Sequence, residues 1–374
     1  MKRILVACDK FKGSLDAADA CAAIRRGLAR RWPAAVIESC PIADGGEGFA
    51  AALLGPLGGR WVECDARDAL DREIRARYVL ADGPGGPVAV MEMAEASGFW
   101  RIAPGERDIL KANTFGTGMM MRHAVAVSGA ARIVIGIGGS ATNDGGAGMA
   151  AALGVRLVDR DGNPLPPWPG VLAERLAGVD GAGRLALPPV TVACDVASPL
   201  LGATGATRVF GPQKGADEAT MPVLERALAA VVRVTAGEAW ALTPGAGAAG
   251  GLGFGLLQFA AARLVPGFDL IAELTDLSAK IAAADLVVTG EGSLDGQSLA
   301  GKGPVGIARL ARAQNKPVWG FCGRADAEAR ASGLFDWIGE LRATGLPLDE
   351  LMTRAAELLE QLASQPAASE ISGL

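Results

Sequence analysis

Short runs of Ile, Val and Leu recur along the chain, separated by longer stretches rich in alanine and leucine. A short apolar run with β-branched members predicts a buried strand, and the stretches between the runs predict helices. The clearest predicted strands are residues 4–8, 36–42, 133–137, 190–194, 286–289 and 318–322. This alternation predicts an α/β fold with a largely parallel sheet.

Glycine, aspartate or both follow each of these runs. In open α/β sheets, ligands bind beyond the carboxyl ends of the strands, so we expect the chemistry at these positions. The residues concerned are Asp9, Asp44, Gly138, Asp195, Gly290 and Gly323.

The pattern changes between residues 61 and 93. Polar and apolar residues alternate over 61–65 and 75–80, and glycine and proline fill 83–87, which predicts antiparallel strands joined by turns. Further helices are predicted over residues 224–238, 307–314 and 350–362.

A chain of 374 residues is long enough for two domains. We predict a Rossmann-like parallel-sheet domain made from residues 1–60 and 264–374, with a second α/β domain, residues 61–263, inserted into it. Clefts between domains are common ligand sites, so we expect the active site in the cleft between these two.

Composition adds two constraints. Glycine accounts for 52 residues, roughly twice its usual share, without a collagen period or a linker tract, so we expect tight loops in which backbone approaches backbone or ligand. The formal net charge of −5 argues against a general nucleic-acid binder, which would normally be basic.

Nothing in the sequence indicates a membrane or secreted protein. The six cysteines form no C-x-x-C pair, which favours buried thiols in a reducing compartment. Only five apolar residues precede Asp9, too few for a signal peptide. The uncharged stretch 239–262 contains Pro244 and six glycines, so we expect a glycine loop leading into a helix instead of a membrane span, in a cytoplasmic protein.

The first candidate segment, residues 9–15, follows the first strand and precedes a helix. A glycine and a hydroxyl at a helix amino end, together with the Lys12 ammonium, could bind an anion. The alternative is a simple helix cap, with Ser14 as the capping residue.

The second segment, residues 41–48, places Asp44 and Glu47 on either side of Gly45 and Gly46. Carboxylates beside exposed backbone suit Mg²⁺ or a sugar-like hydroxyl. An ordinary acidic turn is the alternative.

The third segment, residues 136–148, combines six glycines with two hydroxyls, an amide and the carboxylate of Asp144. Backbone N–H groups and hydroxyls could cradle phosphate while Asp144 holds a metal. Gly136, Gly138 and Ala141 also fit the G-x-G-x-x-A dinucleotide fingerprint loosely. That fingerprint needs a helix starting within it, which would put further glycines in the first turns at about 1 kcal/mol each, so a longer loop is favoured.

Three later segments complete the inventory. Asp195 ends a predicted strand and could reach into a cleft or cap the next turn, and Lys214, in a turn at 210–215, could neutralise an anion. Residues 289–302 carry two acids, three hydroxyls, an amide and a lysine, with a hydrophilic loop as the alternative. Residues 244–253 offer backbone only and are expected to form a close-packing element or a hinge.

The only histidine, His123, lies in a predicted helix, and we interpret it as structural. A Ser-His-Asp triad elsewhere and a histidine-ligated metal site are therefore excluded. Acid–base work falls to carboxylates and lysines, a set that suits phosphoryl transfer.

Together these segments resemble the type I glycerate kinase family. The matching stretches, in the family's order over nearly the whole chain, are residues 9–15, 42–48, 138–149, 210–216, 247–253 and 289–302. The resemblance implies a two-domain α/β fold and phosphorylation of D-glycerate by ATP with Mg²⁺, giving 2-phosphoglycerate. Ser198 departs from the family, which usually has asparagine before Pro199.

The resemblance and the residue types suggest roles. We expect Asp195 to accept the hydroxyl proton, with Asp44 second, and Lys12 to meet the glycerate carboxylate. The expected substrate-binding residues are Asp9, Lys12, Ser14, Gly45, Gly46 and Glu47. The expected nucleotide- and phosphate-binding residues are Gly138, Gly139, Ser140, Thr142, Asn143, Lys214, Ser298 and Lys302. The candidate metal ligands are Asp144, Glu291 and Asp295.

The expected partner is a small molecule, and the protein is expected to be a monomer or homodimer. Two alternatives stay open. One is a nicotinamide-dependent oxidoreductase that uses the loose dinucleotide fingerprint. The other is a catalytically silent sensor that binds a small hydroxy acid and leaves ATP intact.

Overall fold

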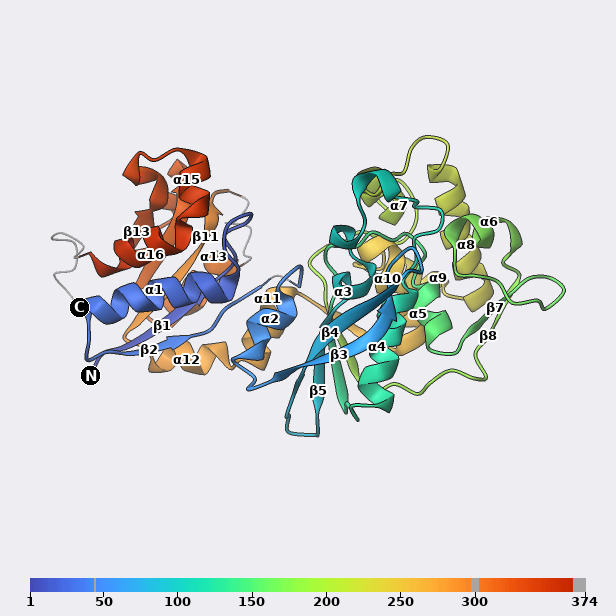
Figure 1. Ribbon diagram of the computed structural model, residues 1–374, viewed down its shortest axis with the longest axis horizontal. Helices are drawn as coiled ribbons and strands as arrows, with labels where there is room; N and C mark the ends of the chain where they lie inside the picture. Colours follow the sequence, from blue (N-terminus) through green and yellow to red (C-terminus); the bar gives the residue numbers. More distant parts are fainter. Residues whose placement is uncertain (44, 297–302, 366–374) are drawn as a thin grey trace. The chain divides into compact units, whose positions relative to one another are not determined.

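The computed structural model describes residues 1–43, 45–296 and 303–365 (Figure 1). It is a mixed α/β structure with a parallel-strand sheet, as the hydrophobic pattern predicts. The chain divides into two compact units. Unit 1 comprises Met1–Asp44, Ala51–Leu57 and Phe268–Leu374, and unit 2 comprises Gly45–Ala50 and Gly58–Gly267.

The sheet of unit 1 has five strands in the order β2-β1-β11-β12-β13, and every neighbouring pair is parallel. Its strands are β1 (Arg3–Cys8), β2 (Val36–Ser39), β11 (Leu286–Leu294), β12 (Val318–Ala325) and β13 (Trp337–Glu340). The chain proceeds from β1 to one edge and from β11 to the other. The order therefore reverses between β1 and β11, the place where doubly wound sheets bind their ligands.

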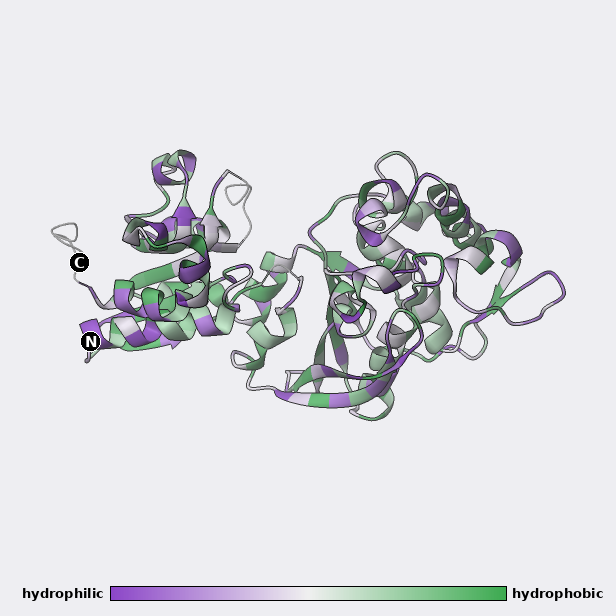
Figure 2. Cartoon of the chain, turned by 45° about the horizontal axis from the view of Figure 1, so that its top comes forward, coloured by the Kyte–Doolittle hydropathy of each residue, from purple (hydrophilic) through white to green (hydrophobic). Residues whose placement is uncertain are grey.

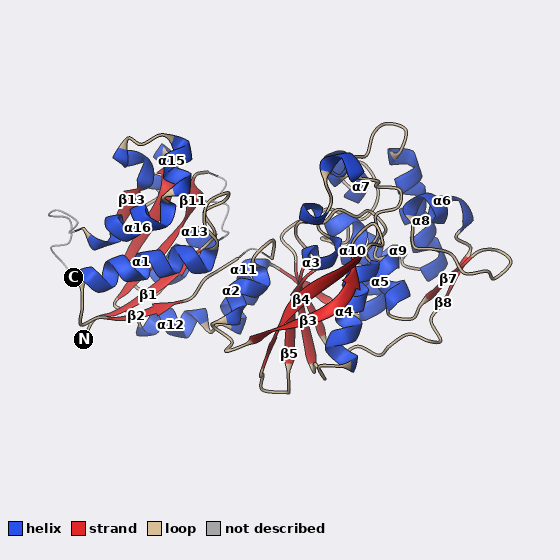
Figure 3. Ribbon diagram, viewed as in Figure 1, coloured by secondary structure: helices blue, strands red, loops and turns tan. Residues whose placement is uncertain are grey.

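Helices flank this sheet (Figure 3). They are α1 (Ala17–Arg31), α11 (Gly267–Leu274), α12 (Leu277–Ala283), α13 (Gly303–Ala313), α14 (Ala327–Ala331), α15 (Leu348–Thr353) and α16 (Ala355–Ser364), with the 3₁₀ turn η5 (Leu341–Thr344). α1 packs against α16, and α12 packs against α13. The Asp16 side chain caps α1 by accepting a hydrogen bond from the Asp19 N–H, which corrects the alternative that Ser14 is the cap.

The core of unit 1 is built on the inward residues of the central strands. Val6, Val288 and Phe321 are fully buried there and pack with Ile24 and Leu28 of α1. Figure 2 shows the corresponding contrast, with hydrophobic central strands and helices of mixed hydropathy. Burial of such side chains contributes roughly 1.5–3 kcal/mol each, which holds the strand ends, and the residues that follow them, in fixed positions.

Unit 2 contains a six-stranded mixed sheet in the order β10-β9-β6-β5-β4-β3. Its strands are β3 (Arg60–Arg67), β4 (Glu73–Ala81), β5 (Val88–Glu92), β6 (Arg132–Gly136), β9 (Val190–Ala193) and β10 (Arg263–Val265), and β7 (Arg156–Val158) pairs separately with β8 (Gly178–Asp180). β3, β4 and β5 are antiparallel, which confirms the prediction from the alternating segment between residues 61 and 93. The remaining neighbours are parallel.

The helices of unit 2 surround this sheet. They are α3 (Ala94–Ser97), α4 (Phe115–Ala126), α5 (Ala147–Ala152), α6 (Pro169–Arg175), α7 (Ala206–Phe210), α8 (Met221–Thr235), α9 (Glu238–Ala241) and α10 (Ala248–Ala260), with 3₁₀ turns η1 (Phe99–Arg101), η2 (Pro104–Glu106) and η3 (Pro212–Lys214). The short helix α2 (Phe49–Leu54) contributes residues to both units. His123 lies in α4, where its Nδ1 is 2.9 Å from the Tyr78 hydroxyl.

The third candidate segment is a long loop. It runs from the end of β6 to α5, which begins only at Ala147 after Gly146 in the left-handed region (φ 75°). No helix starts within residues 136–141, so the loop differs from a dinucleotide-binding turn, as the glycine positions predict. Within the described ranges, no helix is long and apolar enough to cross a membrane.

Several element ends differ from the sequence-based expectations: β11 continues to Leu294, β12 continues to Ala325, and α13 already begins at Gly303. The strand predicted over 36–42 ends at Ser39. The helix predicted over 224–238 stops at Thr235, because Ala236 adopts a left-handed conformation (φ 49°) before Gly237. The helix predicted over 350–362 is two helices, because Arg354 leaves the helical region.

Candidate active site

Unit 1 contains a cavity at the point where its strand order reverses. Its volume is about 740 Å³, and residues that follow β1 and residues at the carboxyl end of β11 line it. Five predicted site residues are among them: Asp9, Lys12, Ser14, Glu291 and Asp295. Residues of the segments 9–15 and 289–302, which are far apart in the sequence, thus line one pocket.

Two glycines allow the backbone around this pocket to approach closely. A Cβ on Gly323 would lie 2.6 Å from the Gly292 carbonyl oxygen, which real side chains do not tolerate. A Cβ on Gly292 would lie 3.3 Å from the backbone nitrogen of Lys12. Small residues at these strand ends therefore keep the loop after β1 in contact with β11.

Ser14 has a structural contact in the pocket wall. Its hydroxyl donates a hydrogen bond of 2.7 Å to the Met352 carbonyl oxygen. Gly13 before it is in the left-handed region (φ 79°). The loop after β1 is therefore tied to α15, and Ser14 supports the pocket at the same time as lining it.

Two of the three candidate metal ligands share this pocket. Glu291 and Asp295 lie at and just beyond the carboxyl end of β11, and Asp295 Oδ2 accepts a hydrogen bond of 3.0 Å from the Ser293 hydroxyl. No group of three or more potential ligands of the His, Cys, Asp or Glu type occurs among the described residues. Mg²⁺ in nucleotide sites needs only one or two carboxylates besides phosphates and water, so this pair fits that ion.

In unit 2, the second and third candidate segments are packed together. Gly138 N donates to the Gly45 carbonyl oxygen at 3.2 Å. A Cβ on Gly138 would lie 2.6 Å from the Gly46 Cα, and a Cβ on Gly45 would lie 2.7 Å from the Ala193 Cβ. Glycine is required on both sides of this contact, which brings Gly45 and Gly46 to the ends of β6 and β9.

The segment 244–253 packs on the same glycine loop. Gly145 N donates to the Gly250 carbonyl oxygen at 3.1 Å, and a Cβ on Gly250 would lie 1.9 Å from the Thr142 carbonyl oxygen. Ala249, Gly250 and Gly251 have positive φ and interrupt the start of α10. The segment is a close-packing element, one of its two predicted roles.

Lys214 is a buried lysine that contacts the glycine loop. It is only 3% exposed, and its Nζ donates hydrogen bonds of 2.8 Å to the Ser140 hydroxyl and to the Thr142 carbonyl oxygen. Burial lowers the pKa of Lys214 to about 7, although the Asp144 charge partly raises it. No ion pair to Lys214 occurs within the part of the chain that the structure describes.

The Asp144 carboxylate accepts hydrogen bonds from its own loop, from the start of α5 and from Thr114 before α4. Oδ2 accepts from Thr114 N and Oγ1, both at 2.8 Å, and from Gly148 N at 3.0 Å, while Oδ1 accepts from Gly146 N at 3.1 Å. Burial raises the pKa of this carboxyl, and these hydrogen bonds oppose the change. The contacts favour a structural role over metal binding, because a metal would have to displace them.

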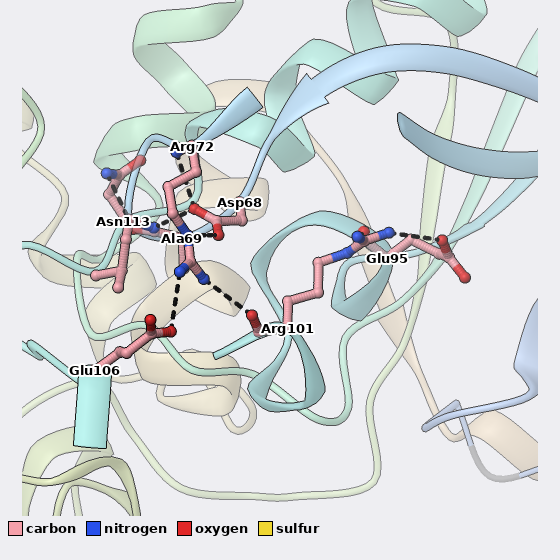
Figure 4. Close-up of polar contacts among 8 residues, drawn as sticks. Asp68, Ala69, Arg72, Glu95, Arg101, Glu106 and Asn113 are labelled. Atoms are coloured by element: carbon pink, nitrogen blue, oxygen red, sulfur yellow. Dashed lines mark hydrogen bonds and ion pairs between the residues drawn. The ribbon is translucent and has the colours of Figure 1, made fainter. Parts of the chain in front are cut away.

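A network of polar and charged contacts in unit 2 includes Asn113, the residue before Thr114 (Figure 4). The Asp68 carboxylate accepts from Arg72, which also donates to Glu106 Oε2 at 2.9 Å. Asn113 N donates to the Ala69 carbonyl oxygen at 3.0 Å. The network therefore fixes the backbone immediately before the Asp144 contact.

Asp195 lies two residues beyond β9. Its Oδ1 accepts a hydrogen bond of 3.1 Å from the Gly267 N–H, and the side chain is half-buried.

The other predicted site residues differ in exposure. Gly139 and Glu47 are exposed, whereas Asn143 is buried and donates to the Thr207 hydroxyl at 3.1 Å. Asp44, Ser298 and Lys302 lie outside the described residues.

Comparison with known proteins identifies the family of the chain. The sequence model of the glycerate kinase family matches residues 4–369. The chain belongs to the glycerate kinase family. The glycerate kinase of Bacillus subtilis strain 168 is 41% identical over 377 residues, with 98% of this chain and 97% of that protein covered. The glycerate 2-kinase of Escherichia coli K12 is 40% identical over 327 residues, with 86% and 85% covered.

A solved structure extends the similarity to three dimensions. A protein assigned as glycerate kinase 2 from Salmonella typhimurium LT2 superimposes with a TM-score of 0.84 at 38% identity, over 97% of this chain and 96% of that one. Members of the glycerate kinase family are kinases, and this chain is therefore an enzyme of the phosphotransferase type.

Sequence reasoning missed the contact that Glu92 makes with the second candidate segment. Glu92 ends β5, is buried, and accepts hydrogen bonds from Gly48 N at 3.0 Å and Ala50 N at 2.8 Å. Burial raises the pKa of Glu92 to about 6. It holds the second candidate segment in place. The one available signal was an acid at the end of an apolar run, as at Asp195.

Replacing Glu92 with glutamine should change how stability depends on pH. The folded-state pKa is above the unfolded value, so the folded form binds more protons between about pH 4.5 and 6 and its stability falls as pH rises through that window. At 1.4 kcal/mol per pKa unit, the contribution is roughly 2 kcal/mol. Urea unfolding of wild type and Glu92→Gln at pH 4.5 and 6.5 should show the variant gaining about this much relative to wild type at the higher pH. Equal differences at both pH values would contradict the assignment, and the exposed Glu238→Gln is the control.

Proposed function

We propose that the protein transfers the γ-phosphoryl group of ATP to a hydroxyl of D-glycerate and releases 2-phosphoglycerate and ADP. The observation that carries this proposal is Lys214, a buried cation held on a glycine loop by a hydroxyl and a carbonyl oxygen. Keeping a cation there is costly unless an anion uses it, and phosphoryl transfer needs such charge. Family membership supports the substrate and the reaction class.

The chemistry can be assigned to residues of this chain. The glycerate hydroxyl oxygen forms a bond to the γ-phosphorus, the bond from that phosphorus to the ADP oxygen breaks, and the hydroxyl proton passes to a carboxylate. We assign that carboxylate to Asp195, with Asp44 as the second choice. Lys214 would compensate the negative charge that spreads over the transferring group.

Gly138, Gly139, Ser140, Thr142 and Asn143 supply the loop that we propose to contact phosphate. Glu291 and Asp295 would hold Mg²⁺, which when bound neutralises phosphate charge. We expect the enzyme to act in the cytoplasm as a monomer or homodimer.

Release of ADP tests the proposal. With Mg·ATP and a panel of small hydroxy acids, a coupled assay should show turnover with D-glycerate well above that with lactate or glycolate. Phosphorus NMR of the product identifies the hydroxyl, because a phosphate at carbon 2 couples to one carbon-bound proton and a phosphate at carbon 3 couples to two. A triplet would identify the product as 3-phosphoglycerate instead of 2-phosphoglycerate. ADP release independent of any hydroxy acid would overturn the assignment to glycerate.

A further inference from the structure

The pocket of unit 1 is much larger than glycerate needs. Cavities of about 300–1,000 Å³ hold ligands of drug size, and this one has a volume of about 740 Å³. A three-carbon acid would leave most of it empty. Its size therefore favours the larger of the two substrates.

The pocket wall has two chemically different parts. One part carries charged groups that follow β1 or lie at the carboxyl ends of β11 and β12, among them Lys10, Lys12 and Arg324. The other part comes from the segment after β13, which belongs to none of the candidate segments and which is apolar apart from Arg342. Its apolar members are Leu341, Leu346, Leu348, Leu351, Met352 and Ala355.

Two of these apolar side chains are not needed by the core of the unit. Leu351 and Ala355 are buried in that core, whereas Leu348 is 72% exposed and Met352 is 38% exposed. Leu348 and Met352 are four residues apart on α15, so they lie on one face of the helix. An apolar ligand surface would cover both of them.

Direct contacts hold the charged part of the wall against the apolar part. The Ser14 hydroxyl donates to the Met352 carbonyl oxygen at 2.7 Å, and a Cβ on Gly13 would lie 3.0 Å from the Met352 methyl carbon. Lys12 is therefore on the turn that contacts α15. A ligand with an apolar end and an anionic end matches this pairing.

We propose that this pocket binds the nucleoside triphosphate, with its base against Leu346, Leu348 and Met352 and its phosphates toward Lys12 and Arg324. This inference rests on the proposed kinase function and identifies which substrate the pocket takes. It assigns Lys12 to the nucleotide, whereas residue type alone pointed to the glycerate carboxylate. Glu291 and Asp295 would then hold the divalent cation that neutralises phosphate charge.

The apolar wall is tested by binding in the absence of glycerate. The affinity of Mg·AMP-PNP, a non-hydrolysable ATP analogue, is measured by calorimetry for wild type, Leu348→Ser and Leu242→Ser, together with that of magnesium tripolyphosphate, which has no base. Leu242 is 78% exposed in unit 2 and is the matched control. Loss of one apolar contact corresponds to about tenfold in affinity.

We expect Leu348→Ser to bind AMP-PNP about tenfold more weakly and tripolyphosphate as wild type does, with Leu242→Ser unchanged for both. An unchanged AMP-PNP affinity in Leu348→Ser, or an equal loss for tripolyphosphate, would overturn the position of the base. Either result can coexist with glycerate-dependent turnover, so it separates this inference from the reaction itself. Absence of turnover with the predicted binding pattern would instead contradict only the reaction.

Lys12→Met tests the charged end. A hydrogen bond to a charged group corresponds to about 10- to 100-fold, so the KM for ATP should rise by that factor while the KM for glycerate changes little. The reverse pattern, a raised glycerate KM with an unchanged ATP KM, would return Lys12 to the substrate carboxylate and overturn its placement on the phosphates.

Discussion

Replacing Asp195 with asparagine is expected to lower kcat by about 100- to 10,000-fold, the usual contribution of a general base. The substitution keeps the shape of the side chain and removes its ability to accept a proton. The asparagine oxygen can still accept the hydrogen bond from Gly267 N, which Asp195 Oδ1 accepts at 3.1 Å. The fold and the KM values should therefore be close to those of wild type.

Steady-state kinetics with glycerate and Mg·ATP, together with thermal unfolding, check this result. If Asp195→Asn retained near-normal kcat, the role of Asp195 as base would be withdrawn and Asp44 would be the next residue to replace. A low kcat accompanied by a large loss of thermal stability would instead indicate a structural role for the carboxylate.

Replacing Lys214 with methionine is expected to lower kcat/KM by about 100- to 1,000-fold, as removal of one preorganised charge donor does in other active sites. Methionine is similar in length and suits a site that is 3% exposed, but it carries no charge. The lost hydrogen bonds to Ser140 and Thr142 cost some stability, and the removal of a buried charge opposes that loss.

The pH dependence gives the matching test in the wild type. Because the pKa of Lys214 is lowered to about 7, the ammonium is present below that pH and is lost as pH rises through it. In the free enzyme, kcat/KM should therefore fall above pH 7. Arginine stays charged over this range, so Lys214→Arg should lack this alkaline limb at whatever activity it retains. An alkaline limb at the same pH in Lys214→Arg would assign the titration to another group.

Strands were the part of the fold that the sequence predicted best. Each of the six predicted apolar runs overlaps a strand, because a buried parallel strand needs a continuous run of apolar residues. Helix ends were less predictable. Ala236 terminates α8 in a left-handed conformation that alanine rarely adopts, and nothing in the composition of residues 224–238 indicates it.

Some site residues could be predicted from the sequence and others could not. Asp9, Lys12, Glu291 and Asp295 could be predicted to share a site because they follow strands of a parallel sheet, and they line one pocket. Contacts between distant segments could not be predicted. Glu92 holds Gly48 and Ala50 only because the chain returns to the end of β5.

The apolar wall of the pocket could not be predicted, because it depends on which side chains the fold leaves exposed. Nothing in the sequence marks the apolar residues within 341–355 as site residues, since only the fold shows that Leu348 and Met352 are left exposed beside charged groups. The roles of the individual site residues, and the division of the work between the two predicted domains, stay predictions.

Phosphorus NMR of the protein with Mg·ATP and D-glycerate tests the central claim most directly. Glycerate phosphorylation predicts that the γ-phosphorus signal of ATP disappears while ADP and one phosphomonoester signal grow in equal amounts, and only when protein and glycerate are both present. ATP that stays intact, or that yields inorganic phosphate at the same rate without glycerate, would contradict it.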